Sequence, residues 1–144
     1  MNKLSIQRDP FFKKFQDKLI QFNTLSKGDK LVVAVSGGLD SVTLLMLLVS
    51  IDDFDLVVTH VDHRLREESK NDQDFVRKLS IDLNIPFFNK TLDPRSRDKK
   101  TSIEEWARLE RYSFLNSILN KTKSKWIMTG HHGNDQVETL LMNL

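Results

Sequence analysis

The sequence contains no cysteine. This absence excludes disulfides, thiolate zinc sites, iron–sulfur clusters and cysteine nucleophiles within the chain. The longest apolar run, residues 42–49, is interrupted by Thr43 and is far too short to span a bilayer. The first nine residues lack the apolar core of a signal peptide. We therefore expect a cytoplasmic protein without a membrane segment, and 144 residues predict one domain.

The net charge is also low: the formal value of +2 is too small to indicate nucleic-acid binding by itself. The positive side chains are nevertheless concentrated in two short segments of the chain. One segment contains Arg95, Arg97, Lys99 and Lys100, and the other contains Lys121, Lys123 and Lys125. Such clusters are most often solvated surface, and otherwise they contact a phosphate backbone. Both interpretations stay open at this point.

Apolar runs typical of strands alternate with segments of helical periodicity. Strands are expected at residues 31–35, 56–61, 86–88 and 126–129, and helices at 9–28, 39–50, 67–84, 103–120 and from about 133 onward. Leu31–Val35 is apolar on both faces, as in a central parallel strand. The pattern predicts an α/β fold in which helices cover both faces of a parallel sheet.

The expected organisation is an N-terminal helix, residues 1–29, packed on a nucleotide-binding domain of residues 30–144. Thr91–Thr101 is polar and basic and carries Pro94, so we predict a mobile loop there. The sequence stops at Leu144 inside a predicted helix without a capping signal. We therefore expect a piece of a longer protein, truncated at its C-terminal end.

The segment Ser36–Ser41 reads Ser-Gly-Gly-Leu-Asp-Ser and joins the apolar strand Leu31–Val35 to an apolar helix. A strand, a tight glycine turn and a helix together present backbone N–H groups to a phosphate. Ser36 and Ser41 add hydroxyl donors. The loop lacks the lysine of the P-loop, and it carries Asp40, a carboxylate suited to Mg²⁺ on a pyrophosphate. The alternative is an ordinary glycine turn.

Two further polar segments follow predicted strands, where ligands bind in parallel α/β sheets. The first is residues 60–66, in which backbone groups suit an adenine edge and Arg64 or Arg66 suits a phosphate. The second is residues 130–139. There we expect Asp135 and Glu138, three residues apart near a helix start, to share one face and hold an ammonium group or a metal. The alternatives are a polar loop and simple complementation of the helix dipole.

The predicted helix 103–120 carries Arg108 and Arg111 on neighbouring positions, and Glu104 is spaced to pair with Arg108. Such pairs usually form a surface network of little energetic value. An arginine turned toward the strand ends would instead neutralise phosphate charge.

A two-metal hydrolase must also be weighed. Its candidate ligands are His60, Asp62, His63, His131, His132 and Asp135. No His-Glu-x-x-His signature is present, and the Ser-Gly-Gly loop would have no role in such an enzyme.

Four motifs together resemble the tRNA(Ile)-lysidine synthetase family. They are Ser36–Ser41; Val61-Asp62-His63-Arg64-Leu65-Arg66-Glu67-Glu68-Ser69; Glu104-x-x-Ala107-Arg108-x-x-Arg111-Tyr112; and Gly130-His131-His132-x-x-Asp135-Gln136-x-Glu138-Thr139. They stand in the family's order and approximate spacing. The family usually has aspartate before Asp135, where this chain has Asn134. The resemblance implies a Rossmann-like PP-loop fold of the adenine nucleotide alpha hydrolase type.

The resemblance also implies an activity. That family is a group of ligases that use ATP to adenylate C2 of the wobble cytidine of an isoleucine tRNA with a CAU anticodon. The ε-amine of free lysine then displaces AMP, and lysidine forms. The implied cofactors are ATP and Mg²⁺, and a homodimer is left open.

By matching positions, the resemblance assigns roles to particular residues. Ser36, Gly37, Gly38, Leu39, Asp40 and Ser41 would hold the ATP phosphates, with Asp40 as the metal ligand, and His63 and Arg66 would lie by the nucleotide. The implied catalytic residues are Asp40, Arg111, His131 and Asp135. Asp135 and Glu138 would bind lysine. Two other hypotheses stay open: tRNA thiolation by the same adenylation chemistry, and an ATP-binding module without turnover.

Overall fold

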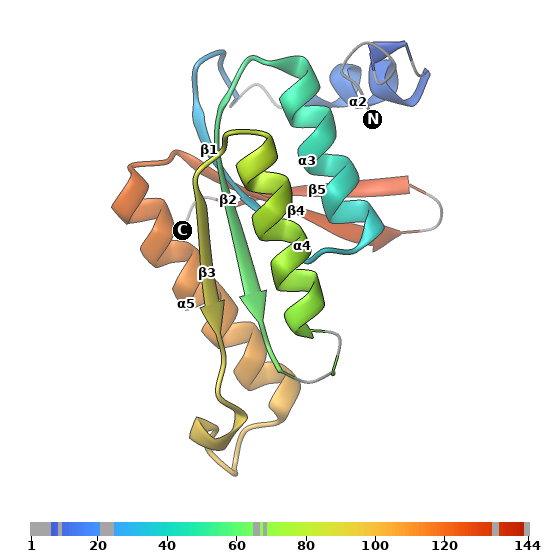
Figure 1. The fold of residues 1–144 in the computed structure, drawn as a ribbon. Helices are drawn as coiled ribbons and strands as arrows, with labels where there is room; N and C mark the ends of the chain where they lie inside the picture. Colours follow the sequence, from blue (N-terminus) through green and yellow to red (C-terminus); the bar gives the residue numbers. More distant parts are fainter. Residues whose placement is uncertain are drawn as a thin grey trace.

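A computed structural model describes residues 7–8, 10–20, 25–64, 67, 69–133 and 136–142 of the chain. These residues form a five-stranded sheet with the strand order β3-β2-β1-β4-β5 (Figure 1). The strands are β1 (Lys30–Ala34), β2 (Asp55–Asp62), β3 (Phe87–Thr91), β4 (Trp126–Gly133) and β5 (Gln136–Met142). The first four are parallel to one another, and β5 runs antiparallel to β4.

Strand β1 lies at the centre because it is apolar on both faces and pairs with a strand on each side. Its Val33 lies in register with Val58 of β2 and with Met128 of β4, and all three side chains are buried. A strand covered on both faces must be apolar throughout, which the Leu31–Val35 run satisfies. The predicted parallel α/β sheet is confirmed.

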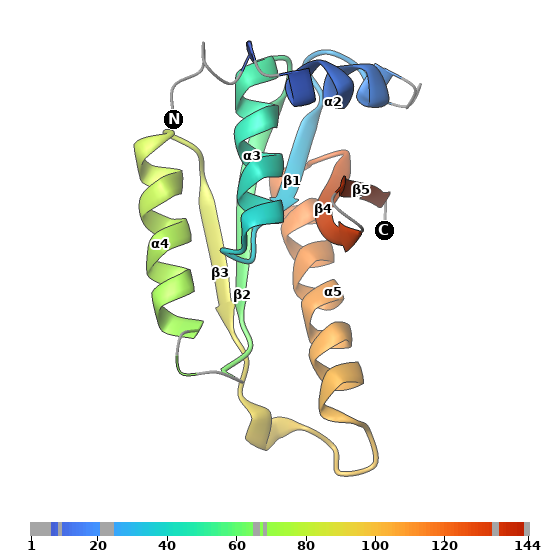
Figure 2. The same cartoon turned by 90° about the vertical axis from the view of Figure 1, so that its right-hand side faces the viewer.

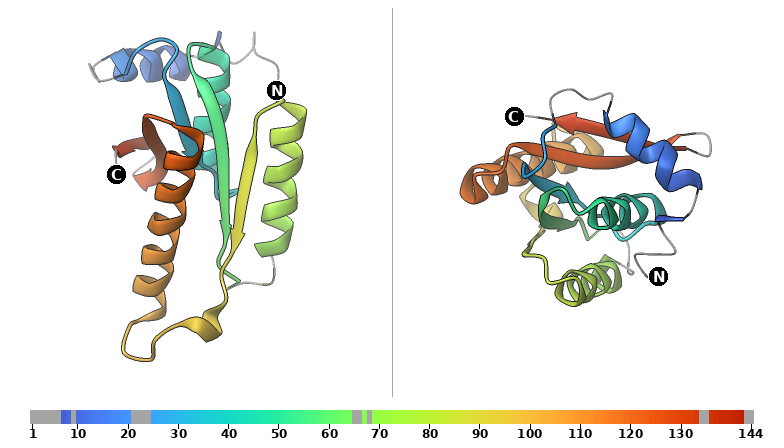
Figure 3. Two further views of the ribbon diagram at one scale, coloured as in Figure 1. Left: turned by 90° about the vertical axis from the view of Figure 1, so that its left-hand side faces the viewer. Right: turned by 90° about the horizontal axis from the view of Figure 1, so that it is seen from above.

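Helices cover both faces of this sheet (Figures 2 and 3). Helices α3 (Leu39–Ile51) and α4 (Ser69–Asp82) lie on one face, and α5 (Ile103–Thr122) lies on the other. Helix α2 (Pro10–Ile20) packs against α3, and a short 3₁₀ turn, η1 (Pro94–Ser96), precedes α5. Among the described residues, none of the helices combines the length and the apolar character that crossing a membrane requires.

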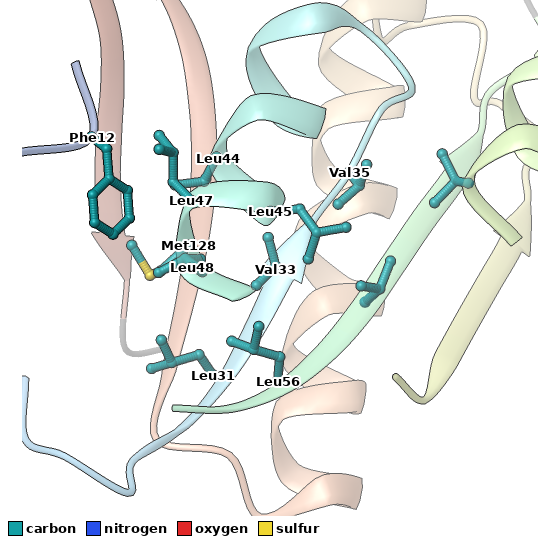
Figure 4. Packing of buried hydrophobic residues seen from close by; sticks show 12 residues of the cluster. Phe12, Leu31, Val33, Val35, Leu44, Leu45, Leu47, Leu48, Leu56 and Met128 are labelled. Carbon is teal, nitrogen blue, oxygen red and sulfur yellow. The ribbon is translucent and has the colours of Figure 1, made fainter. Parts of the chain in front are cut away.

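The larger core forms between α3 and the sheet, and α2 closes its edge. Leu44, Leu45 and Leu48 of α3 are fully buried against the β1 side chains, and Phe12 of α2 packs at the margin (Figure 4). Fully burying a leucine side chain contributes about 1.5–3 kcal/mol. A second cluster on the opposite face joins Leu115, Ile118 and Leu119 of α5 to the sheet. The two clusters hold the carboxyl ends of the strands in fixed relative positions.

Three sequence-based predictions differ from the structure. The first helix ends before Lys27–Gly28, since Leu25 and Ser26 are not helical; its expected cap, Asp9, lies outside the described residues. The segment predicted as a mobile loop contains η1 and a set of internal hydrogen bonds. Phe75, expected on the buried face of α4, is 51% exposed, whereas Val76 is buried.

The predicted helix from about Gly133 is also wrong, because residues 136–142 form β5. Gly133 pairs with Gln136, so β4 and β5 form an antiparallel pair joined by two residues. The stretch Gln136-Val137-Glu138-Thr139 alternates polar and β-branched residues, which suits a strand as well as a helix. Pairing with the edge of β4 decides between the two, since it satisfies the backbone groups of both strands.

Candidate functional site

The Ser36–Ser41 loop is held together by the hydroxyl of Ser41. Its Oγ accepts a hydrogen bond from the Ser36 N–H at 3.0 Å, donates to the Gly38 carbonyl at 3.1 Å and lies 3.0 Å from the Ser36 Oγ. The Ser36 Oγ in turn accepts from the Gly38 N–H at 3.2 Å. Both hydroxyls therefore fix the backbone of the loop in addition to being donors for a ligand.

Gly37 requires glycine for two separate reasons. Its φ of +94° is a conformation that residues with a side chain rarely adopt. In addition, a Cβ there would lie 3.1 Å from the Asp72 Cβ. Asp72 belongs to the first turn of α4, so the start of a second helix lies directly against the loop. This close approach places a carboxylate beside a segment shaped for anions.

The loop leads into α3, whose N-cap residue is Gly38 and provides no capping hydrogen bond. The N-terminus of a helix carries partial positive charge, and its first N–H groups lack partners within the helix. Asp40 lies in this first turn, and β4 approaches it closely: a Cβ on Gly130 would lie 3.3 Å from the Asp40 carbonyl oxygen. An uncapped helix start beside a glycine turn is an anion site.

A cavity of about 740 Å³ opens from this loop at the carboxyl ends of the strands. Its lining comes from the loop, from the ends of β1, β2 and β4, from α4 and from α5. The polar members of the lining are Ser36, Ser41, Thr59, His60, Asp62, His63, Ser69, Asp72, Glu104, Arg108, Arg111 and Thr129. A cavity of this size accommodates a nucleotide, since small-molecule sites measure about 300–1,000 Å³.

Helix α5 contributes two arginines to the lining of the cavity. The Arg111 Nε is buried and has no hydrogen-bond partner among the described residues, and its guanidinium lies 5.4 Å from the Tyr112 ring centre. Arg108 is engaged: its Nη2 and Nε donate to the Glu105 carboxylate at 2.7 and 3.0 Å. This pairing lowers the pKa of Glu105 and raises that of Arg108. A buried polar atom without a partner is unusual, so Arg111 is the better candidate for a ligand contact.

Residues at the end of β2 also line the cavity. The His60 ring is buried, and its Nδ1 lies 2.8 Å from the Val35 carbonyl oxygen; because a carbonyl only accepts, Nδ1 carries the proton. The Asp62 carboxylate accepts the Arg64 N–H at 2.9 Å. His60 therefore ties β2 to β1. Among the described residues no group of three or more His, Cys, Asp or Glu side chains could hold a metal ion. The side chains of His131, His132 and Asp135, three of the hydrolase candidates, lie outside the description.

The structure brings many of the predicted site residues to one cavity. Ser36, Gly37, Gly38, Ser41, His63 and Arg111 line it. Leu39 is 80% exposed at the first position of α3, next to the half-buried Asp40. Arg66 and Asp135 lie outside the described residues. The backbones of His131 and Glu138 lie opposite each other in the β4–β5 pair, and their side chains are outside the description. Glu138 therefore lies on a strand, not on the expected helix.

Two cavity residues on α4 had not been assigned a role from the sequence, Ser69 and Asp72. Ser69 is buried at the first position of α4, and Asp72 follows three residues later. The Ser69 Oγ is buried and has no hydrogen-bond partner among the described residues, so it does not cap the helix. That this helix start meets Gly37 depends on the packing of α4 beside β2.

The residues present fit a magnesium ion bound chiefly by a ligand. The hydroxyls of Ser36 and Ser41, which are hard oxygen donors, line the cavity. Asp40 lies in the first turn of α3, is half-buried and is not among the lining residues. Mg²⁺ usually keeps several waters and takes one or two carboxylates together with substrate phosphates. A site with few protein carboxylates is therefore consistent with Mg²⁺ carried by a nucleotide.

Comparison with known proteins gives relatives with named activities. The chain is 38% identical over 136 residues to a tRNA(Ile)-lysidine synthase from Persephonella marina, covering 90% of this chain and 30% of that protein. It is 40% identical over 136 residues to the corresponding protein of Thermosipho africanus, covering 91% and 32%. The chain thus spans about a third of the length of these curated relatives.

Solved structures share the fold at low sequence identity. A U34-tRNA thiolase, NcsA from Methanococcus maripaludis with its [4Fe-4S] cluster, matches with a TM-score of 0.71 and 18% identity, over 87% of this chain and 47% of that one. An NH3-dependent NAD synthetase from Campylobacter jejuni matches with a TM-score of 0.56 and 17% identity, over 88% and 56%. The family model of the PP-loop domain matches residues 11–144. Because this match covers more than half of the sequence, the chain belongs to the PP-loop domain family.

Proposed function

We propose that the chain is the adenylating part of an enzyme that forms lysidine on an isoleucine tRNA. The observation that carries the proposal is the cavity itself, whose lining includes the glycine loop, Ser41 in the first turn of α3, and Arg111. A triphosphate bound there would meet backbone N–H groups at one end and a guanidinium at the other. The named relatives support a tRNA as the second substrate.

In the proposed reaction, the O2 oxygen on C2 of the wobble cytidine bonds to the α-phosphorus of ATP. The bond from that phosphorus to the oxygen bridging it to the β-phosphate breaks, and pyrophosphate leaves. The lysine ε-amine then bonds to C2 and AMP departs. Ser36, Gly37, Gly38, Leu39 and Ser41 would hold the phosphates through N–H and O–H donors. Arg111 would stabilise the charge that develops on the transferred phosphoryl group.

The remaining roles rest on the family resemblance. Asp40 would hold Mg²⁺, which neutralises phosphate charge when bound. His63 and Arg66 would contact the nucleotide, and His131 would act near the leaving group. Asp135 and Glu138 would bind the ammonium group of lysine. Carboxylates suit that group because an ammonium carries three donors and a full positive charge.

The test is pyrophosphate release with ATP, a CAU-anticodon isoleucine tRNA and lysine. We expect release to depend on the tRNA, and lysidine to form only when lysine is added. Asp40→Ala should abolish adenylation, whereas Asp135→Asn should chiefly raise the lysine concentration required. Asp82→Ala, an exposed aspartate at the end of α4, is the matched control and should behave like the parent. Release that ignores both tRNA and lysine would contradict the proposal.

One observation favours a second candidate, an ATP-binding module without turnover: the chain covers only 30–32% of the two relatives described. Tight ATP binding without formation of AMP would support it. Thiolation of tRNA would need sulfur chemistry for which the chain offers no cysteine. The likeness to the thiolase supports a common fold only.

A further inference from the structure

Residues 93–101 form a basic segment beside the mouth of the cavity, here called the arm. It contains four positive side chains and two aspartates, a net charge of +2, which equals the formal charge of the whole chain. The arm joins the end of β3 to the start of α5, at the end of the molecule opposite α2 (Figure 1). The arm is therefore one of two local concentrations of positive charge in the sequence, the other being residues 121–125.

The arm is anchored to the cavity at both ends. At one end Leu92 is buried, lines the cavity, and donates its N–H to the Asp62 carbonyl at 2.8 Å. At the other end Ser102 begins α5, whose first two turns carry Glu104 and Arg108 on the cavity wall. Whatever contacts the arm therefore also lies at the cavity mouth.

Hydrogen bonds within the arm give it a defined shape. The Asp93 carboxylate accepts from Arg95 Nε at 3.0 Å and Nη2 at 3.2 Å, and it also accepts the Arg95 N–H. The Arg97 guanidinium donates to the Thr101 carbonyl, and the Asp98 carboxylate accepts the Lys100 N–H at 3.0 Å. An arm ordered in this way loses little conformational entropy when it binds.

The same hydrogen bonds engage the two aspartates of the arm, whereas its lysine side chains stay exposed. Both aspartates are engaged inside the arm, whereas the exposed Lys99 and Lys100 have no side-chain partner within the described ranges. Arg64, at the end of β2, is exposed and near enough that its charge adds to that of Arg95 in lowering the pKa of Asp93. The outward surface of the arm is thus cationic even though it contains carboxylates.

We propose that the arm binds the phosphate backbone of the RNA whose base enters the cavity. This inference rests on the proposed function, because a base can be adenylated only if its flanking phosphates lie at the cavity mouth. Single-stranded RNA loops are recognised through splayed bases together with backbone contacts, and lysines neutralise the backbone phosphates. Lys99 and Lys100 supply two such contacts.

The test uses the 144-residue chain and a fluorescent anticodon stem-loop RNA with a CAU anticodon, followed by anisotropy over a salt series. The variant is the double substitution Lys99→Gln/Lys100→Gln. The matched control is Lys13→Gln/Lys14→Gln, which removes the same charge from exposed positions on α2. Neither pair belongs to the cavity lining, so ATP affinity, measured in parallel, should stay at the parent value.

We expect the arm variant to bind the RNA roughly tenfold more weakly near 0.1 M salt. The slope of log affinity against log salt should decrease by about 1.4, that is, about 0.7 for each lysine. The control should change both quantities much less. Equal weakening by the two variants, no RNA binding by the parent, or equally tight binding of polyglutamate would each overturn the inference. Pyrophosphate release tests the proposed function separately, so the two can fail independently.

Discussion

Two helices that contribute to the cavity lining, α3 and α5, begin in opposite ways. Helix α5 begins at Ser102, whose hydroxyl accepts the Glu105 N–H at 3.2 Å, and two acidic residues lie in its first turn. Helix α3 begins at Gly38, which provides no capping hydrogen bond. A side chain of the protein caps the first turn of α5. The first turn of α3 has no side-chain cap, and its N–H groups suit an anion. From this contrast we expect the loop and the start of α3 to bind an anion through backbone N–H groups, and α5 to bind it through long side chains.

The largest expected effect on the reaction rate comes from removing Arg111 of α5. Arg111→Ala should slow adenylation by about 10²–10³-fold, because a preorganised cation at the transferred phosphoryl group is lost. ATP affinity should change much less. The measurement is the rate of pyrophosphate release at saturating ATP and tRNA.

Arg108→Ala is the matched control for that arginine, one helical turn away on the same helix. Its ion pair with Glu105 is solvent-exposed, and such pairs contribute little to stability. If Arg108→Ala slowed adenylation more than Arg111→Ala, the assignment of the two arginines would be reversed.

Gly37→Ala should disrupt the backbone geometry of the Ser36–Ser41 loop. The substitution combines a strained φ of +94° with a contact of 3.1 Å to the Asp72 Cβ. We expect ATP affinity to fall by about 1–3 kcal/mol, roughly 5- to 150-fold, as measured by calorimetry. Gly28→Ala shares the positive φ, at +89°, but meets nothing within 4 Å. It should lower the free energy of unfolding and leave ATP affinity intact; equal losses of affinity would argue against a special loop geometry.

A smaller effect is expected for Ser41→Ala, which removes the hydroxyl that organises the loop. ATP should bind about tenfold more weakly, since the Ser36 N–H loses its acceptor at a cost of about 1–3 kcal/mol. Ser50→Ala removes another buried hydroxyl of α3, bonded to the Met46 carbonyl at 2.8 Å. This control should lower thermal stability alone. Unchanged ATP affinity in Ser41→Ala would show that the hydroxyl network is dispensable for binding.

Ser102→Ala tests the capped helix start directly. Loss of the cap should reduce the free energy of unfolding by about 1 kcal/mol, measured by denaturant titration, without any change in ATP affinity. Ser102→Asp retains a capping acceptor and should restore the stability. A change in ATP affinity would mean that the start of α5 is itself part of the binding site.

The smallest effect concerns pH and the arm. Hydrogen bonds from Arg95 hold the pKa of Asp93 below its usual value near 3.8. A folded pKa below the unfolded one stabilises the pair above the unfolded pKa, and this stabilisation is lost as the pH falls through the folded value. The carboxyl carbon of Asp93, followed by NMR, should titrate below the usual range, and Arg95→Gln should return it toward that range. An identical titration in the two proteins would show that the pair does not form in solution.

Much of the fold could be predicted because its signals are local. The Leu31–Val35 run, the Gly-Gly turn and the Ser102 cap each determine an element within a few residues. The segment after Gly133 could not be predicted in this way. Its alternation suits both helix and strand, and the choice depends on pairing with β4. The arm was likewise missed, since its order comes from hydrogen bonds among charged side chains that usually indicate a loop.

By itself, the sequence determined which backbone segment could receive an anion, because only glycines and short hydroxyl residues allow such a turn between a buried strand and a buried helix. It also determined that Arg111 shares a helix face with Arg108. Only the tertiary structure decided that Asp72 lies against Gly37 and that Arg111 and the loop line the same cavity. The physical reason is that local sterics and periodicity act within a few residues. The order of strands and the helices on each face arise from burying apolar surface over the whole chain.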